Sequence, residues 1–194
     1  MGGYLAASLS LTTLSLCDND LGDEGVEALS LRLKQSKSLT KLDLSNHVSR
    51  SVKFGPRGTV ALAAALADST SLAVLSLTSN HPGKIEVKAT EVQGASLNRG
   101  DKAVHQGRAI TVVREKDGDG MIEIFEPSGV LALADALLVN RSLTRLCISQ
   151  EPLKDFGTEA CKALECALRF RSGEGFDLEP FMLSFEGLST IPLS

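Results

Sequence analysis

The sequence predicts an α/β protein built from repeated strand–helix units, with short parallel strands on one face and helices on the other. Two observations predict this fold class: short runs of alternating leucines recur along the 194-residue chain, and each of the first three precedes an Ala- and Leu-rich stretch with helical spacing. A third observation adds a small antiparallel β insertion, because the stretch before the last unit has β-type runs and no helical stripe.

The strand half of each unit is a leucine pattern. It reads L-T-T-L-S-L-C-D-N-D-L from Leu11, and it recurs as L-T-K-L-D-L-S-N-H from Leu39, L-A-V-L-S-L-T-S-N from Leu72 and L-T-R-L-C-I-S-Q-E-P-L from Leu143. Alternation of leucine with polar residues is typical of a strand that has one buried face. Four copies in one chain therefore predict four equivalent strands.

The helical half follows a glycine. The stretches G-V-E-A-L-S-L-R-L from Gly25, G-T-V-A-L-A-A-A-L from Gly58 and G-V-L-A-L-A-D-A-L from Gly129 each precede the next leucine pattern, and a looser copy starts at Gly157. Their apolar residues have the spacing of a helix with one buried stripe. The glycine before each helix is interpreted as a tight turn out of the strand region.

These motifs resemble leucine-rich repeats. The copy from Leu11 matches the signature L-x-x-L-x-L-x-x-N-x-L, and the long helical half is similar to the ribonuclease-inhibitor type, which also builds the repeat domains of NLR-like receptors. The resemblance covers roughly residues 5–82 and 128–170. It implies a leucine-rich-repeat solenoid, with parallel strands on the concave face and helices on the convex face, that binds protein partners.

The expected organisation has four parts. Residues 1–82 hold a partial N-terminal helix, two repeats and the strand of the third; residues 83–128 form the inserted β module; residues 129–171 hold the third helix and the fourth repeat; residues 172–194 form a cap and tail. In the insertion, the runs K-I-E-V-K, K-A-V-H, A-I-T-V-V and M-I-E-I-F are separated by turn residues. They predict a meander of three or four antiparallel strands.

The residues between the leucines are expected to point out of the concave face. The candidate partner-binding residues are Thr13, Ser15, Lys41, Asp43, Val74, Ser76, Arg145 and Cys147. Arg145 and Lys41 are the expected anchors of a non-catalytic protein–protein interaction module, since arginine is enriched in binding hot spots. The alternative is an ordinary solvated sheet surface within a longer repeat array. The sequence does not identify the partner.

The stretch R-E-K-D-G-D-G-M-I-E-I-F-E from Arg114 favours a second hypothesis, a calcium-dependent binding protein with an EF-hand-like loop. Its expected ligands are Glu115, Asp117, Asp119 and Glu126. Against this hypothesis, β-branched residues precede the loop, and Pro127 disfavours helical geometry for Glu126, whereas an EF-hand needs helices on both sides. D-G turns that close a β-hairpin explain the same glycines without a metal.

Composition excludes several classes of function. The net charge is −4, from 20 basic and 24 acidic residues, so the chain lacks the positive excess that favours nucleic acid or an anionic membrane. No hydrolase elbow, P-loop or paired-histidine motif is present, so we expect no enzyme, no cofactor and no metal.

Four cysteines without C-x-x-C spacing favour a reduced, cytoplasmic location. Asn140-Arg141-Ser142 matches the glycosylation sequon, which needs a secretory route to be used.

Overall fold

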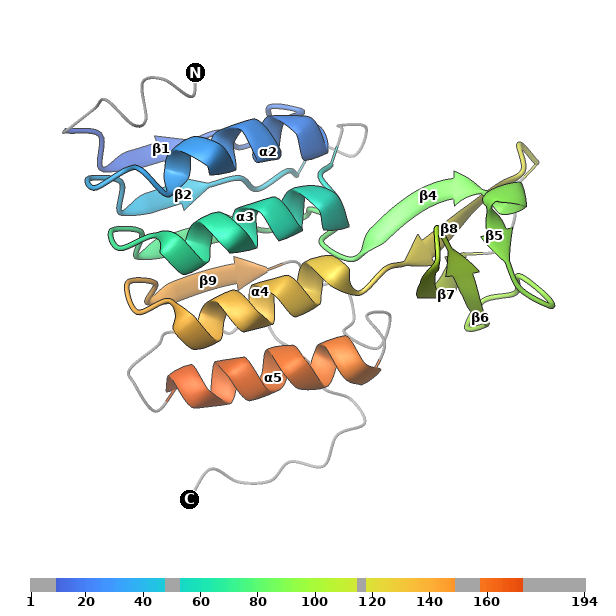
Figure 1. Cartoon of the computed structure of the whole chain (residues 1–194). Coiled ribbons are helices and arrows are strands. Elements are labelled where there is room, and N and C mark those ends of the chain that lie inside the picture. The colour runs from blue at the N-terminus through green and yellow to red at the C-terminus, as the bar shows by residue number, and fades with distance from the viewer. Residues whose placement is uncertain (1–9, 48–52, 115–117, 149–157, 173–194) are drawn as a thin grey trace.

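The computed structural model describes residues 10–47, 53–114, 118–148 and 158–172. The described elements form a parallel sheet, an antiparallel sheet and a layer of helices (Figure 1). In chain order they are β1 (Thr13–Ser15), α2 (Gly22–Leu33), β2 (Lys41–Asp43), α3 (Pro56–Asp68), β3 (Val74–Leu77), β4 (Lys84–Lys88), the 3-10 turn η1 (Ala89–Glu91), β5 (Val92–Gln93), β6 (Lys102–His105), β7 (Arg108–Arg114), β8 (Met121–Phe125), α4 (Ser128–Val139), β9 (Arg145–Ile148) and α5 (Thr158–Ser172).

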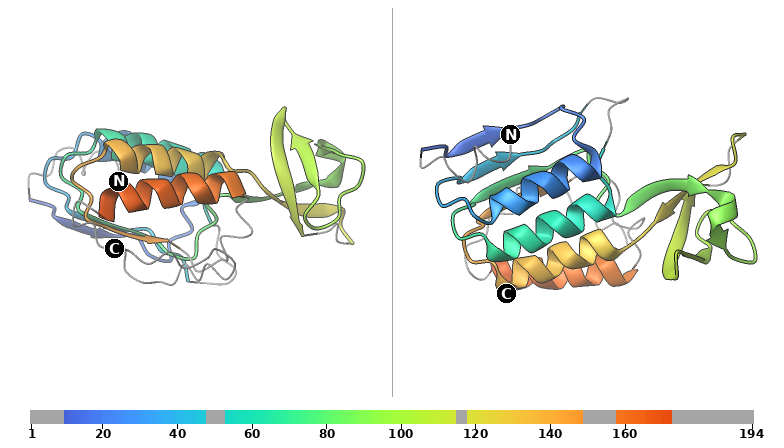
Figure 2. Two further views of the ribbon diagram at one scale, coloured as in Figure 1. Left: turned by 90° about the horizontal axis from the view of Figure 1, so that it is seen from below. Right: turned by 45° about the horizontal axis from the view of Figure 1, so that its top comes forward.

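The parallel sheet has the strand order β1-β2-β3-β9. Helices α2, α3, α4 and α5 pack side by side in the same order and all lie on one face of this sheet (Figures 1 and 2). Each described strand–helix pair is therefore a β–α unit with its helix antiparallel to its strand, as the leucine and glycine patterns predict.

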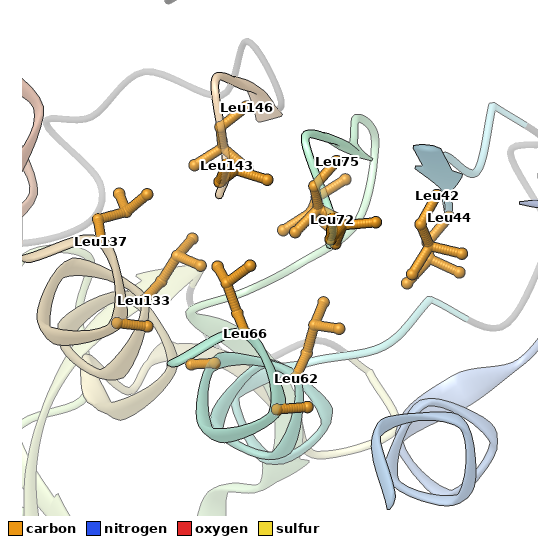
Figure 3. Close-up of a cluster of buried hydrophobic side chains, with 14 of the residues drawn as sticks. Leu42, Leu44, Leu62, Leu66, Leu72, Leu75, Leu133, Leu137, Leu143 and Leu146 are labelled. Carbon is orange, nitrogen blue, oxygen red and sulfur yellow. The ribbon is translucent and has the colours of Figure 1, made fainter. Parts of the chain in front are cut away.

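A single apolar layer lies between the sheet and the helices (Figure 3). Leu42, Leu75 and Leu146 occupy equivalent positions on neighbouring strands, and their exposed fractions are 0%, 0% and 2%. The helices contribute buried residues to the same layer at helical spacing. Among these are Leu62, Leu66, Leu133 and Leu137.

The antiparallel sheet, here called the β module, has the strand order β4-β8-β7-β6-β5. It has a hydrophobic core of its own, separate from the leucine layer. Strands β6 and β7 are joined by Gln106-Gly107, whose φ angles of 49° and 76° are those of a two-residue hairpin turn matched to strand twist. The four predicted runs are all strands, and β5 is a fifth strand that the sequence did not indicate.

The predicted fold class, a leucine-rich-repeat solenoid with a small β insertion, is wrong. The described chain is a mixed α/β protein with a four-stranded parallel sheet and a five-stranded antiparallel sheet. The physical reason is that the stretch between β3 and α4 forms the larger of the two sheets and buries its own core. The strand–helix repetition is therefore interrupted, between β3 and α4, by a second sheet with a core of its own.

The β module projects away from the helices, beyond the end at which α3 and α4 begin (Figures 1 and 2). Its two connections to the parallel sheet and helices are held closely together. Phe125 ends β8 and is buried in the leucine layer, and a Cβ on Gly83 would lie only 2.0 Å from its ring. The amide of Glu126 donates to the carbonyl of Gly83 at 2.8 Å. The module is therefore attached through a compact neck, in which two segments of the chain run close together.

Three of the glycines for which the sequence pattern predicts a turn out of the strand region already lie in a helix. These are Gly25, Gly58 and Gly129, in the first turns of α2, α3 and α4. A Cβ on Gly129 would lie 2.1 Å from the carbonyl oxygen of Pro82 and 3.0 Å from the Cα of Pro56. Close approach of backbone, rather than a turn, therefore requires glycine at this position.

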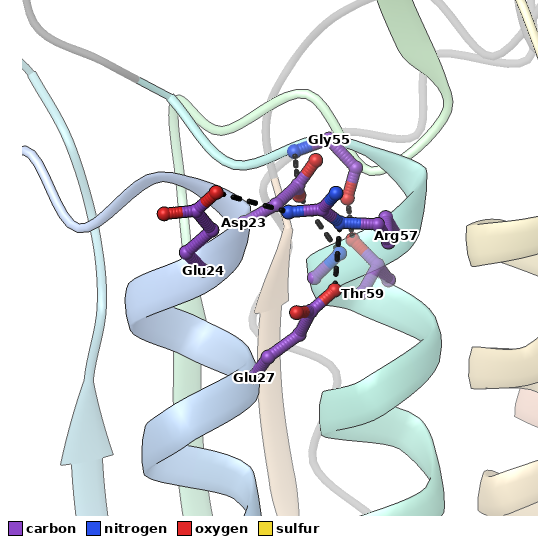
Figure 4. A network of polar contacts seen from close by, with 7 residues as sticks. Asp23, Glu24, Glu27, Gly55, Arg57 and Thr59 are labelled. Carbon is purple, nitrogen blue, oxygen red and sulfur yellow. Dashed lines mark hydrogen bonds and ion pairs between the residues drawn. The ribbon is translucent and has the colours of Figure 1, made fainter.

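Helix α3 begins against a carboxylate from the preceding helix (Figure 4). Oδ1 of Asp23 accepts hydrogen bonds from the backbone amides of Gly55 and Gly58, both at 2.8 Å. These amides belong to the helix start, where N–H groups have no partner within the helix. On the surface beside them, Arg57 pairs with Glu27 at 2.7 Å. Asp23 thus caps α3 from α2 and links two consecutive units.

Two expected parts of the chain lie outside the described residues. The partial N-terminal helix falls largely on residues 1–9, and the C-terminal cap and tail fall on residues 173–194. The β module extends from β4 to β8 and is followed directly by α4.

We expect Gly129→Ala to lower the free energy of unfolding by about 1–3 kcal/mol, because the new methyl group overlaps the carbonyl of Pro82. This loss would occur although alanine favours a helix more than glycine does. Urea unfolding followed by circular dichroism measures it. Gly118→Ala is the control, since a Cβ at that position would meet nothing within 4 Å. Equal unfolding midpoints for the two variants would contradict the close-packing role.

We expect Asp23→Ala to destabilise the protein by about 1–3 kcal/mol, because two helix-start amides lose a charged acceptor. The matched control is Glu24→Ala in the same helix, whose side chain is 93% exposed and whose contact with Arg57 is 3.9 Å long. That change should stay within about 0.5 kcal/mol of the parent. The same urea titration compares both, and similar losses would argue against the cap.

Candidate functional site

The parallel sheet brings the eight candidate binding residues into two rows. Its register pairs Thr13 with Lys41, Lys41 with Val74, and Val74 with Arg145. The second row has the same alignment and consists of Ser15, Asp43, Ser76 and Cys147. We call these eight residues the strand face.

The strand face is exposed because its neighbours in sequence are buried. In β3 the pattern alternates, with Val74 and Ser76 half-buried and Leu75 and Leu77 buried. Thr13, Ser15 and Lys41 are exposed, and the remaining residues of the face are half-buried. Side chains of a strand alternate between two faces, so burial of the leucines against the helices forces these residues to the opposite side.

Charge on the strand face is concentrated in the first row. Lys41 and Arg145 lie on either side of Val74, two strands apart, which corresponds to roughly 10 Å between backbones. The acidic member of the face, Asp43, is engaged locally, since its Oδ1 accepts from the amide and the hydroxyl of Ser45 at 3.0 and 2.5 Å. The row therefore presents two cations that flank an apolar side chain.

Cys17 lies just beyond the face, at the end of β1. A hydrogen bond with Ser45 lowers the pKa of its thiol, but the contact with Asp18, partial burial, and the charges of Asp18 and Asp43 together raise the pKa above its ordinary value. Sγ donates to the Asp18 carboxylate at 3.1 Å. A thiol with a raised pKa is a poor nucleophile, because the thiolate is the reactive form.

A small recess lies at the carboxyl ends of β1 and β2. Its cavity volume is about 10 Å³. Its lining is formed by Leu16, Asn19, Asp20, Leu21, Leu44, Ser45, Asn46, Phe54 and Asn80. A cavity of this volume holds about one water molecule, so the recess is too small for an organic substrate. Its Asn80 amide already donates to the carbonyl of Leu44 at 2.7 Å and therefore has a structural role.

The structure does not bring Asp119 and Glu126, two of the expected calcium ligands, together. Glu115 and Asp117 lie outside the described residues. Asp119 precedes β8 and Glu126 follows it, so a five-residue extended strand of about 17 Å separates them. Oε1 of Glu126 is occupied by Arg108 at 2.6 Å and by the hydroxyl of Ser128 at 2.5 Å. Strands β7 and β8 on either side of this stretch pair as an antiparallel hairpin, which is the alternative to a calcium loop.

No metal site was found in the described part of the chain, since no three His, Cys, Asp or Glu side chains there are grouped to hold an ion.

The asparagine of the glycosylation sequon is unsuited to modification in the folded protein. Asn140 is 2% exposed, and its side-chain nitrogen donates to the carbonyls of Leu66 and Ser69 at 2.7 and 2.9 Å. Sequence reasoning missed this structural role, because nothing in the local pattern shows a partner seventy or more residues away.

Comparisons with known proteins add little to this geometry. No protein-family model and no curated protein matches the chain. A solved structure described as "Leiomodin-1 Actin-Binding Site 2 (ABS2)" is similar with a TM-score of 0.49 and 16% identity, covering 89% of this chain and 73% of that one. A likeness at this level carries no argument about fold or function. The resemblance to leucine-rich repeat proteins is not tested by these findings and stays a prediction.

None of the helices in the described ranges combines the length and hydrophobicity that a transmembrane span requires.

We expect millimolar calcium to leave the melting temperature unchanged, because Glu126 is held by Arg108 and Ser128 at the far end of β8 from Asp119. A site with micromolar affinity would add about 4 kcal/mol at a thousandfold excess of ligand over Kd. Melting curves with calcium, with magnesium and with a chelator make the comparison. A rise in melting temperature with calcium alone, reversed by the chelator, would restore the calcium hypothesis.

Proposed function

We propose that the protein is a non-catalytic, cytoplasmic protein–protein interaction module that binds a protein partner through the strand face. The observation that carries this proposal is the alignment of eight exposed or half-buried side chains in two rows across four parallel strands. The opposite side of the same strands is covered by helices, so the strand face is the side on which a partner could pack.

The composition of the face supports recognition by a few anchors. Lys41 and Arg145 supply charge, and Val74 between them supplies an apolar contact. Arginine is enriched among residues that dominate binding energy, and its planar guanidinium matches a carboxylate. We therefore propose that these three residues form the centre of the interface and that the partner places an acidic side chain beside Arg145.

The interface would extend beyond the eight residues. A stable complex buries roughly 800 Å² on each partner, which is more than two short rows provide. The turns that follow the strands continue the same surface, with Asp18, His47 and Ser79 in successive units. They are already linked to one another, since the amide of His47 donates to Asp18 at 2.6 Å and the His47 ring lies 3.4 Å from the Ser79 hydroxyl.

The β module is proposed as a second interaction surface. It projects beyond the helix ends instead of folding over the strand face, so the two surfaces are available independently (Figure 2). The module exposes polar side chains, such as the cross-strand pair of Arg114 with Glu86 at 2.5 Å. No catalytic role is proposed for either surface.

A photo-crosslinking amino acid at Val74 tests this proposal in cells. We expect a discrete crosslinked product from Val74 and none from Ala64, an exposed position on helix α3. Lys41→Glu with Arg145→Glu should abolish the product, whereas Lys34→Glu with Lys162→Glu, two exposed lysines on the helix side, should preserve it. Crosslinking that is equal from both positions, or that survives the reversal at Lys41 and Arg145, would refute binding through the strand face.

A further inference from the structure

An apolar patch is exposed where α4 and α5 end. Leu138 and Val139 at the end of α4 are 40% and 60% exposed, and Phe170 near the end of α5 is 50% exposed. The guanidinium of Arg141 lies 5.4 Å from the centre of the Phe170 ring and so connects the two helix ends. We call these four residues the helix-end patch. Exposed apolar residues that gather in one place, rather than singly, usually mark a surface that something covers.

We propose that the helix-end patch is covered by the chain's own segment Phe176–Phe185. This segment begins six residues after Phe170, so even a fully extended chain places Phe176 within about 20 Å of the patch. The proposal is independent of the strand face, which lies on the opposite side of the leucine layer.

The composition of the segment is complementary to the patch. It reads F-D-L-E-P-F-M-L-S-F, which combines six large apolar residues with two acidic ones and has no basic residue. Three of the seven phenylalanines of the whole chain fall within these ten residues. The patch offers apolar side chains beside the cation of Arg141, so an acidic, aromatic-rich segment matches it in both respects.

Covalent attachment favours this occupant over a second copy of the chain. A short flexible connection gives an effective concentration on the order of millimolar, which exceeds the concentration of any free copy in ordinary solution.

Phe170→Trp in the full-length chain tests the proposal, because the protein has no other tryptophan and the indole reports directly on the patch. We expect blue-shifted emission and weak quenching by acrylamide. Changing Phe176, Phe181 and Phe185 to Ser in that background should shift the emission to the red and raise quenching to that of a half-exposed indole, as for Phe170 at 50% exposure. Ile191→Ser with Leu193→Ser is the matched control and should change neither quantity.

A second variant reverses charge without removing apolar residues. Asp177→Lys with Glu179→Lys places cations beside Arg141 and should also raise quenching, while circular dichroism shows that the fold is retained. Quenching that is the same in the parent, the serine variant and the lysine variant would overturn the proposal. Protection that increases with protein concentration, together with dimers in sedimentation, would also overturn it, because a second copy would then be the occupant.

Discussion

The leucine layer between the parallel sheet and the helices is the constraint on which the rest of the structure depends. Its strand members, such as Leu42 and Leu75, are completely buried, and a strand places successive side chains on opposite faces. Burial of these leucines therefore decides that Lys41, Asp43 and Val74 point away from the helices. A shift of one residue in the register of any strand would bury its polar residues and expose its leucines, so the strand face has no freedom to rearrange.

The neck of the β module also depends on burial in the leucine layer. Phe125 belongs to β8 of the module but is buried in the leucine layer, so one side chain is shared between the two parts of the protein. Glu126, which follows it, binds Arg108 from β7 and Ser128 from the start of α4. This carboxylate therefore joins the module to the helix layer. Glu126, the last residue of the stretch that matches a calcium loop in sequence, serves here as a structural connection through its ion pair with Arg108.

Local periodicity predicted the strands and helices because each depends on residues close in sequence. The alternation around Leu75 and the helical spacing after Gly58 were sufficient for that. The wider arrangement depends on contacts that no local pattern records. β5 has only two residues and is too short to carry a signal, and Gly129 is required by a carbonyl from Pro82, forty-seven positions earlier. The overall fold class was wrong for the same reason, since nothing local shows that the insertion has a core of its own. Of the candidate site, the two rows of the strand face could be predicted, because their alignment follows from equivalent leucines.

Apolar packing alone does not fix how far each strand slides along its neighbour, because one leucine contact is much like the next. Directional hydrogen bonds supply that information. Asp23 on α2 binds the amides at the start of α3, Asn80 after β3 binds the carbonyl of Leu44 in the preceding unit, and Asn140 after α4 binds the carbonyl of Leu66 on α3. Each of these side chains reaches from one unit to the backbone of the one before or after it, so each leaves a buried polar group unsatisfied if the units slide. The alignment of Lys41, Val74 and Arg145 across three strands is therefore maintained by polar residues that lie outside the face itself.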